Sequence, residues 1–407
     1  MKTDNTIHES GKLLLFRLSD NILSILLDSK GKALTINVYP RDQTVQVGNI
    51  CVCRVQKNAA SLNAVFVDLP DGTSGYLKLK DNKSPFFIRH SAKLPVRQGE
   101  RLLVQIQKDS IKGKVVSVTS DITLPGKYCV LKAGNEMLCF SDKFRDLTKK
   151  SDIKKKTAQE NFTGAGFIIR TNACFAESET IISEMKDLYG QWIDIRKSAL
   201  ESSGICMLYT PPADFLKDIR DVFEDSYEFI ITDDADIYHQ ACEYIKTVSP
   251  SSLEKLRFYS NADIPFSTAY DISNILMQAL SRKVWLRSGA YIFIEPTQAL
   301  TAIDVNTGKH ITSKDPEDEY LKINQEAAAE IARQIRLRNL SGIIIIDFIN
   351  MKSEEHKKLL MDYLKTQLKY DPINTNIIEM TKLDLVELTR TKIRKPLYEL
   401  LSISLLQ

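Results

Sequence analysis

Four consecutive isoleucines at positions 343–346 are followed directly by Asp347. β-Branched side chains lose rotamer freedom in a helix and fit a pleated strand, so this run predicts a strand. An apolar run without polar alternation needs cover on both faces, which a sheet with helices layered against it supplies. The flanking sequence indicates such a layered α/β domain. It predicts strands at 291–295, 299–305, 342–348 and 375–380, helices at 318–338 and 353–370, and a last helix beyond them.

The first third of the chain has a different pattern. Strand-like runs at 12–18 and 22–27 precede five more short runs, at 45–55, 62–68, 74–79, 101–107 and 115–119. Such a series predicts a small closed barrel, for which an OB fold is the leading candidate. Farther on, the basic stretch 143–156 is interpreted as containing a loop, and apolar periodicity predicts a helix at 177–201.

Composition limits the class of protein. A length of 407 residues exceeds one ordinary core and suggests two to four packed units. With 43% hydrophobic and 26% charged residues, the chain is typical of soluble globular proteins. The sequence contains neither an apolar run of membrane-spanning length nor an apolar start typical of a secreted chain. Its seven irregularly spaced cysteines fit reduced thiols, so a cytoplasmic location is expected. A net charge of +3 excludes a uniformly basic coat but not local basic surfaces.

Two aspartates stand where apolar strands end. Asp304 ends one strand, Asn306 follows on the same face, and Asp347 ends the isoleucine strand. Ligand sites in open α/β sheets lie outside such strand ends. Two carboxylates with a nearby amide oxygen form an all-oxygen site suited to magnesium or manganese. The alternative, that each aspartate caps a turn or a loop, is open on strand-end position alone.

Aromatic and basic residues in the predicted barrel indicate a nucleic-acid surface. Phe66 and Tyr76 lie on neighbouring predicted strands, joined by the Asp71-Gly72 turn. Exposed rings on a barrel face stack bases, whereas buried rings would simply fill the core; both interpretations are open. Lysines that could hold phosphates follow the rings: Lys78, Lys80, Lys112 and Lys114.

Two other basic features could bind phosphate. Arg170 with Thr171 fits a terminal phosphate, although a surface salt bridge is the commoner use of a lone arginine. The run 389–395 carries Arg390 and Lys392 on helical spacing and could grip a nucleic-acid backbone, or form a solvated face. The sequence contains no Walker motif and no Ser/His/Asp order, which disfavours nucleotide-driven chemistry.

Several long motifs resemble the ribonuclease E/G family, in the same order along the chain. They are 284–289, 300–308, 326–338 running on to 347, 385–394, 166–171 and the barrel. The resemblance implies an α/β multi-subdomain chain. It would have an RNase H-like subdomain (1–38 and 215–280) interrupted by an S1 RNA-binding barrel of OB fold (39–120) and a 5′-sensor (121–214). A DNase I-like α/β catalytic subdomain (281–407) would follow.

The resemblance also implies an activity. The family cleaves single-stranded, usually AU-rich RNA to 5′-phosphate and 3′-hydroxyl ends, in ribosomal RNA processing and messenger RNA turnover. Carried across by motif, Asp304 and Asp347 would hold magnesium, and Asn306 would orient a carboxylate or the scissile phosphate. The RNA-binding set is expected to be Phe66, Tyr76, one of Lys112 or Lys114, and, from composition, Arg390 and Lys392. The family's 5′-monophosphate pocket matches Gly126, Val130, Arg170 and Thr171.

One departure from the family affects the expected assembly. The short cysteine motif that links protomers through zinc is absent, and no CxxC occurs anywhere. Structural zinc is therefore not expected, and the homo-oligomeric state stays open. A non-catalytic RNA-binding protein is the main alternative, and a structural or protein-interaction role is a third. Both carboxylates and Asn306 are present, which favours the enzyme.

Overall fold

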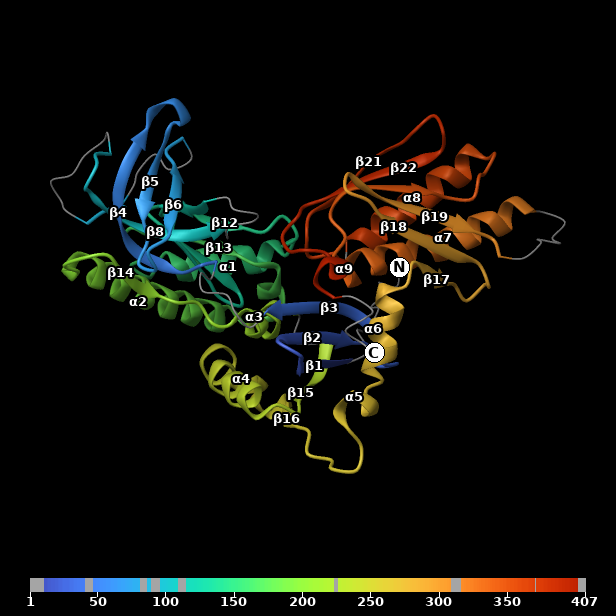
Figure 1. Ribbon diagram of the computed structural model, residues 1–407, viewed down its shortest axis with the longest axis horizontal. Helices are drawn as coiled ribbons and strands as arrows, with labels where there is room; N and C mark the ends of the chain where they lie inside the picture. Colours follow the sequence, from blue (N-terminus) through green and yellow to red (C-terminus); the bar gives the residue numbers. More distant parts are fainter. Residues whose placement is uncertain are drawn as a thin grey trace. The chain divides into compact units, whose positions relative to one another are not determined.

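The computed structural model describes residues 11–40, 47–80, 86–88, 96–108, 115–222, 226–308, 316–369 and 371–401 (Figure 1). The chain forms two compact units. Unit 1 comprises residues 1–40, 224–243 and 251–407, and unit 2 comprises 41–223 and 244–250. Unit 1 is therefore assembled from three separate stretches of sequence, and unit 2 is largely an insertion within it.

The first sheet of unit 1 joins the N-terminal strands to strands from the middle of the chain. Its order is β16-β15-β1-β2-β3. The strands are β1 (Gly11–Leu18), β2 (Asn21–Leu27), β3 (Ala33–Pro40), β15 (Tyr227–Thr232) and β16 (Leu256–Phe258). The neighbouring helices are α4 (Ala235–Val248), α5 (Phe266–Ala269) and α6 (Ile272–Leu280). Its RNase H-like type stays a prediction, and β3 was not predicted from the sequence.

The second sheet of unit 1 contains the predicted α/β region. Its order is β17-β18-β19-β20-β22-β21. The strands are β17 (Lys283–Trp285), β18 (Tyr291–Pro296), β19 (Leu300–Asn306), β20 (Gly342–Asp347), β21 (Thr375–Met380) and β22 (Leu385–Arg390). The helices are α7 (Pro316–Leu337), α8 (Glu354–Leu368) and the short α9 (Leu397–Leu400). The alternating strands and helices of this region are confirmed, but β22 is a strand where only a last helix was expected.

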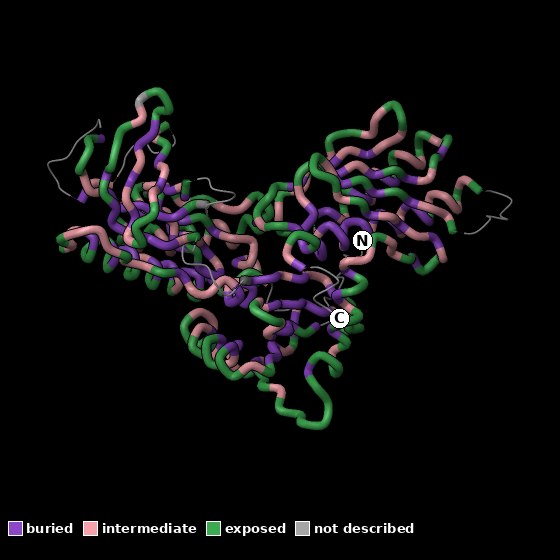
Figure 2. The backbone as a smooth tube through the Cα atoms, in the orientation of Figure 1, coloured by how far each residue is buried: buried purple, intermediate pink, exposed green. Residues whose placement is uncertain are grey.

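Helices α7 and α8 cover one face of this second sheet and leave the other open. The inward side chains of β18, β19, β20 and β22 share a core with apolar residues of both helices. Figure 2 colours the buried stretches of these strands and helices purple. In β20, Ile344 and Ile346 are fully buried, whereas Ile343 is 49% exposed. The prediction of an isoleucine strand buried on both faces is therefore wrong, because only alternate residues reach the helical layer.

Unit 2 contains the predicted closed barrel. Its strands are β4 (Ile50–Ala59), β5 (Ala64–Asp68), β6 (Ser74–Lys78), β8 (Arg101–Lys108) and β9 (Val116–Thr119). The sheet order β4-β5-β6-β9-β8 closes because β8 also pairs with β4, and β6 runs parallel to β9. The barrel core is formed by inward residues of these strands, among them Val65, Val67 and Leu77. The remaining strand β7 (Phe86–Phe87) pairs with β8.

A second sheet of unit 2 packs against two helices. Its order is β10-β11-β13-β12. The elements are β10 (Thr123–Pro125), β11 (Cys129–Ala133), β12 (Leu138–Phe140), β13 (Ala165–Ile169), α1 (Leu147–Thr157) and α2 (Ser178–Glu201), with α3 (Asp214–Asp221) later in the chain. The helix expected at 177–201 is confirmed as α2. Strand β14 (Cys206–Tyr209) pairs with β4 of the barrel sheet, although the sequence grouped it with the 5′-sensor.

The basic stretch expected to contain a loop is largely helix α1. The side chain of Asp146 accepts a hydrogen bond from the backbone N–H of Lys149 and caps the first turn. Three lysines, at 154–156, lie in the last turn, where positive charge stabilises the negative end of the helix dipole. These terminal interactions compensate for the like charges, so the stretch adopts a helix.

Candidate functional site

The two predicted carboxylates lie side by side on the open face of the second sheet of unit 1. Strands β19 and β20 are parallel, and their register places Asp304 directly opposite Asp347. Both side chains are exposed. Asn306 lies on the same face, where its Nδ2 donates a hydrogen bond of 2.6 Å to Asp304 Oδ2. The structure thus brings together all three residues that the sequence assigned to catalysis.

The electrostatics of this pair favour a cation. The pKa of Asp347 is raised, first by partial burial and second by the negative charge of Asp304. A divalent ion between the two carboxylates would remove this repulsion. The available ligand atoms are all oxygens, from two carboxylates and one amide. This small set suits magnesium, because Mg²⁺ keeps several waters and binds one or two carboxylates. Within the described ranges, no group of three or more His, Cys, Asp or Glu could hold a metal ion.

A turn beside the site is held by helix α7. The carboxylate of Glu326 accepts hydrogen bonds from the backbone N–H groups of Arg287 and Ser288, at 2.6 and 3.3 Å. Gly308 has a φ of +72°, and a Cβ there would come within 2.2 Å of the Gly289 carbonyl oxygen. This close approach requires glycine. The contact between Gly308 and Gly289 holds the chain after β19 against the turn between β17 and β18.

The predicted rings of the barrel lie opposite each other and outside its core. Phe66 and Tyr76 are paired across β5 and β6, with ring centres 5.7 Å apart. Both are half-buried, while their neighbours Val65 and Val67 are fully buried, so the rings point away from the barrel interior. Lys57 Nζ lies 4.9 Å from the Phe66 ring centre. Lys57 was not predicted from its position in the sequence, because only the β4–β5 pairing brings it to the ring. Lys112 and Lys114 lie outside the described residues.

The predicted terminal-phosphate residues gather around the end of β13. Arg170 Nη1 donates a hydrogen bond of 2.7 Å to the Gly126 carbonyl oxygen, and its Nη2 donates one of 2.9 Å to Asp221 Oδ1. The Thr171 hydroxyl lies 3.0 Å from that of Ser141. Val130 lies on β11, opposite Ile168. The salt-bridge alternative for Arg170 is thus realised here, and a phosphate would have to compete with Asp221 for the guanidinium.

A carboxylate that the sequence did not reveal fixes the loop at 126–129, which connects β10 to β11. The backbone N–H groups of Lys127, Tyr128 and Cys129 donate to Glu184 at 2.5, 2.8 and 2.9 Å. A Cβ at Gly126 would lie 2.5 Å from the Glu184 carboxyl carbon, so a side chain there would displace this carboxylate from its backbone hydrogen bonds. Glu184 is on α2, far from the loop in sequence, and no local pattern could have identified it.

The structure contradicts the RNA-binding role predicted for Arg390. This side chain is 4% exposed and forms an ion pair with Asp371, its Nε lying 2.7 Å from Oδ2. It also donates to Asn339 Oδ1 and the Leu340 carbonyl. The expected helical spacing is wrong as well, because Arg390 ends strand β22 and a loop follows. Lys392 is exposed in that loop, and its role stays a prediction.

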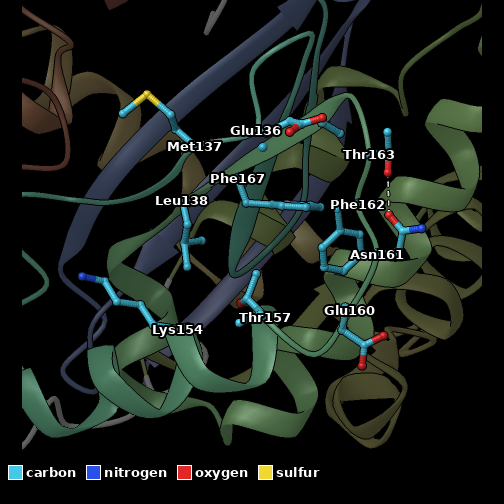
Figure 3. A pocket seen from close by; sticks show the side chains of 13 residues that line it. Glu136, Met137, Leu138, Lys154, Thr157, Glu160, Asn161, Phe162, Thr163 and Phe167 are labelled. Carbon is cyan, nitrogen blue, oxygen red and sulfur yellow. Dashed lines mark hydrogen bonds between the residues drawn. The ribbon is translucent and has the colours of Figure 1, made fainter.

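Unit 2 also contains a cavity. It has a volume of about 450 Å³ and is lined by β12, β13, the end of α1 and the loop between α1 and β13, including Leu138, Lys154, Phe162 and Phe167 (Figure 3). Phe162 and Phe167 pack edge to face within it, with ring centres 4.8 Å apart. None of the predicted site residues lines this cavity.

The part of the chain that the structure describes contains no helix that is long and apolar enough to cross a membrane.

Comparisons with known proteins agree with the sequence motifs. The model of the ribonuclease E/G family matches residues 123–393. Ribonuclease G of Salmonella typhimurium (strain SL1344) is 33% identical over 360 residues, covering 86% of this chain and 73% of that protein. The ribonuclease E/G-like protein of Pyropia yezoensis is 34% identical over 365 residues, covering 88% and 71%. Ribonuclease G of Escherichia coli (strain K12) is 32% identical over 366 residues, covering 87% and 74%. The extent of these matches shows that the chain belongs to the ribonuclease E/G family.

Proposed function

We propose that this chain is a magnesium-dependent endoribonuclease, with manganese as a possible substitute, that hydrolyses single-stranded AU-rich RNA to 5′-phosphate and 3′-hydroxyl ends. The observation that carries the proposal is the opposed pair Asp304–Asp347, with Asn306 bonded to one member of it. Family membership supports the same reaction. Ribosomal RNA processing and messenger RNA turnover are the processes in which we expect it to act.

Each group at the site has a distinct task in this proposal. Asp304 and Asp347 would hold the ion, which when bound supplies Lewis-acid activation of water and stabilises charge on the phosphate. Asn306 positions the Asp304 carboxylate, because its amide fixes one oxygen by a hydrogen bond. The open sheet face gives a flexible RNA strand access to both carboxylates.

The rest of the RNA would be held by unit 2. Phe66 and Tyr76 offer ring faces and edges for base stacking, and Lys57 places positive charge beside them. Arg170 and Thr171 would bind a 5′-monophosphate. The guanidinium should bind this terminal group more strongly than an internal phosphodiester, because a terminal phosphate has more charge and more free oxygens. In unit 1, Lys392 is expected to contact the RNA backbone.

The proposal is tested by cleavage of a labelled, 5′-monophosphorylated AU-rich RNA. Wild-type protein should cut it with magnesium and not with EDTA. Asp304→Asn and Asp347→Asn should each lower the cleavage rate by about 100-fold or more, because each removes a ligand of the ion. Asp362→Asn, an exposed aspartate on α8, serves as the matched control and should cleave normally.

Binding of the same RNA, measured in EDTA, separates the competing functions. Retained binding with lost cleavage in the two variants supports the enzyme. Binding without cutting by the wild-type protein would instead indicate a non-catalytic RNA-binding protein. Cleavage by both variants at the wild-type rate would refute the assignment of Asp304 and Asp347.

A further inference from the structure

Three aromatic rings and one lysine form a patch on the open face of the second sheet of unit 1. The aromatic patch comprises Lys283 and Trp285 of β17 and Tyr291 and Phe293 of β18. The ring centres of Trp285 and Tyr291 are 5.2 Å apart, and those of Tyr291 and Phe293 are 5.6 Å apart, both nearly edge to face. Lys283 Nζ lies 3.9 and 3.8 Å from the Trp285 and Tyr291 ring centres.

Strand alternation fixes the side of the sheet on which the patch lies. Ile292 and Ile294, which flank Phe293 in sequence, are fully buried in the core beneath α7 and α8. Tyr291 and Phe293 therefore point to the opposite face. Trp285 is 63% exposed, so its indole presents a large apolar surface to solvent.

The aromatic patch is continuous with the candidate catalytic residues. The antiparallel β18–β19 register places Phe293 directly opposite Asp304, and Tyr291 directly opposite Asn306. Directly opposite side chains have Cβ atoms about 5 Å apart. The β17–β18 register then places Trp285 opposite Tyr291. The rings thus lead from the carboxylates across two strands to the edge of the sheet.

We propose that the aromatic patch stacks a nucleobase of the RNA strand next to the phosphate that an ion bound by Asp304 and Asp347 would hold. This inference rests on the proposed function, since it requires a phosphate at those carboxylates. Base–aromatic stacking tolerates any base because every base has a π-face. Trp285 is the ring most open to such a contact, and Tyr291 and Phe293 support it.

The chemistry of the patch favours a nucleic acid over an apolar peptide. Lys283 forms no ion pair with a carboxylate among the described residues, and its ammonium is held over the rings by cation–π attraction. A stacked base presents its own phosphate to this ammonium, whereas an apolar segment would bury the charge without compensation. Trp285 would thus bind the base of a nucleotide, and Lys283 would bind its phosphate.

Trp285 itself provides a direct readout of occupancy. The chain has two tryptophans, and the other, Trp192, is 3% exposed in the core of unit 2. In a Trp192→Phe background, the emission comes from Trp285 alone. Titration with a short single-stranded AU-rich RNA, with Ca²⁺ in place of Mg²⁺ at the carboxylates, should quench it, and gel analysis verifies that the RNA stays intact. An abasic strand of the same length and charge should bind through its phosphates but leave the emission unchanged.

Ring-removing variants test the energy of the contact. Trp285→Ala and Tyr291→Ala should each weaken RNA binding, measured by anisotropy of labelled RNA, by about 5- to 150-fold, the range typical of one stacked base. Trp285→Phe keeps a ring and should restore most of the affinity. Phe258→Ala, which removes an exposed ring of the other sheet of unit 1, is the matched control and should bind normally.

The outcomes distinguish this inference from the proposed function. Equal quenching by abasic and normal RNA, or normal binding by both alanine variants, would refute base stacking at the patch even if cleavage proceeds as proposed. A concentration-dependent shift of Trp285 emission without RNA, matched by sedimentation as a dimer, would show that a second copy covers the patch and would also refute it. Cleavage by Asp304→Asn would refute the proposed function by a separate measurement.

Discussion

Arg390 and Asp371 form an ion pair from which water is almost entirely excluded. Arg390 is 4% exposed and Asp371 is 1% exposed. Two guanidinium nitrogens donate to the two carboxylate oxygens of Asp371. The third nitrogen, Nη1, donates to Asn339 Oδ1 and to the Leu340 carbonyl oxygen. A buried charge is tolerated only when it is paired and hydrogen-bonded. The pair therefore connects the end of β22 to the loop after α8.

At this scale we predict that Arg390→Met lowers the free energy of unfolding by about 3–5 kcal/mol, because it leaves Asp371 charged and buried without its partner. Urea denaturation followed by circular dichroism would measure the change. Lys392→Met, two residues away and exposed, should stay within about 0.5 kcal/mol of wild type. An Arg390→Met protein that is fully stable but binds RNA poorly would restore the original RNA-binding assignment.

Helix α7 is connected to strand β3 by a network of charged groups within unit 1. Glu330 accepts hydrogen bonds from Arg333, Lys32 and Gln334, and Arg333 Nη1 also donates to the Ala33 carbonyl. Burial raises the pKa of Glu330, but the hydrogen bonds and charges of Arg333 and Lys32 outweigh it and lower the pKa from 4.5 to about 2. The ionised carboxylate is thus favoured by the folded state.

The pH dependence of stability follows from this lowered pKa. A carboxyl group with a lower pKa in the folded state stabilises it above its unfolded pKa, and the effect disappears as pH falls through the folded pKa. We predict that Glu330→Gln lowers the free energy of unfolding at pH 7 by up to about 3 kcal/mol. The difference from wild type should be constant above about pH 4.5 and vanish towards pH 2.

Denaturant titrations over this pH range would measure the effect. Glu355→Gln, at an exposed position on α8, is the control and should change stability little at any pH. A Glu330→Gln deficit of the same size at pH 2.5 and pH 7 would contradict the ionic origin of the link.

The proposed functions are divided between the two units of the molecule. Unit 1 carries Asp304 and Asp347, whereas unit 2 carries the barrel rings and Arg170. Cleavage and recognition of the RNA 5′ end should therefore be separable by mutation. Asp221 forms an ion pair with Arg170 and would therefore compete with the RNA 5′-phosphate for the guanidinium.

At the scale of the molecule, we predict that Arg170→Gln removes the preference for 5′-monophosphorylated over 5′-hydroxyl RNA and leaves the cleavage rate of 5′-hydroxyl RNA unchanged. Loss of charge-assisted hydrogen bonds to phosphate should cost about 1.5–3 kcal/mol, or roughly 10- to 150-fold in the preference. Asp221→Asn should increase the preference, since it weakens the competitor. Parallel cleavage assays on the two RNAs would measure all three proteins. Equal loss of both substrates in Arg170→Gln would assign it a structural role instead.

Local patterns in the sequence determined much of the fold and the placement of the candidate catalytic residues. Apolar periodicity predicted α2 and α7, and short alternating runs predicted the five barrel strands, because these features depend on neighbours within a few residues. The spacing of Asp304 and Asn306 placed both on one strand face. The position of Asp347 at the end of a parallel strand placed it beside them, as the register shows.

Tertiary structure alone decided the features that depend on residues distant in sequence. The packing of distant segments determines that Arg390 pairs with Asp371 and that β14 pairs with β4. It also determines that one face of β20 stays exposed. The same holds for the contact of Glu184 with its loop and for the aromatic patch beside Asp304. A residue's type and its immediate neighbours fix its local conformation. Its burial and its partners are set by the chain as a whole, because the free energy of burying a charge or a ring depends on what surrounds it.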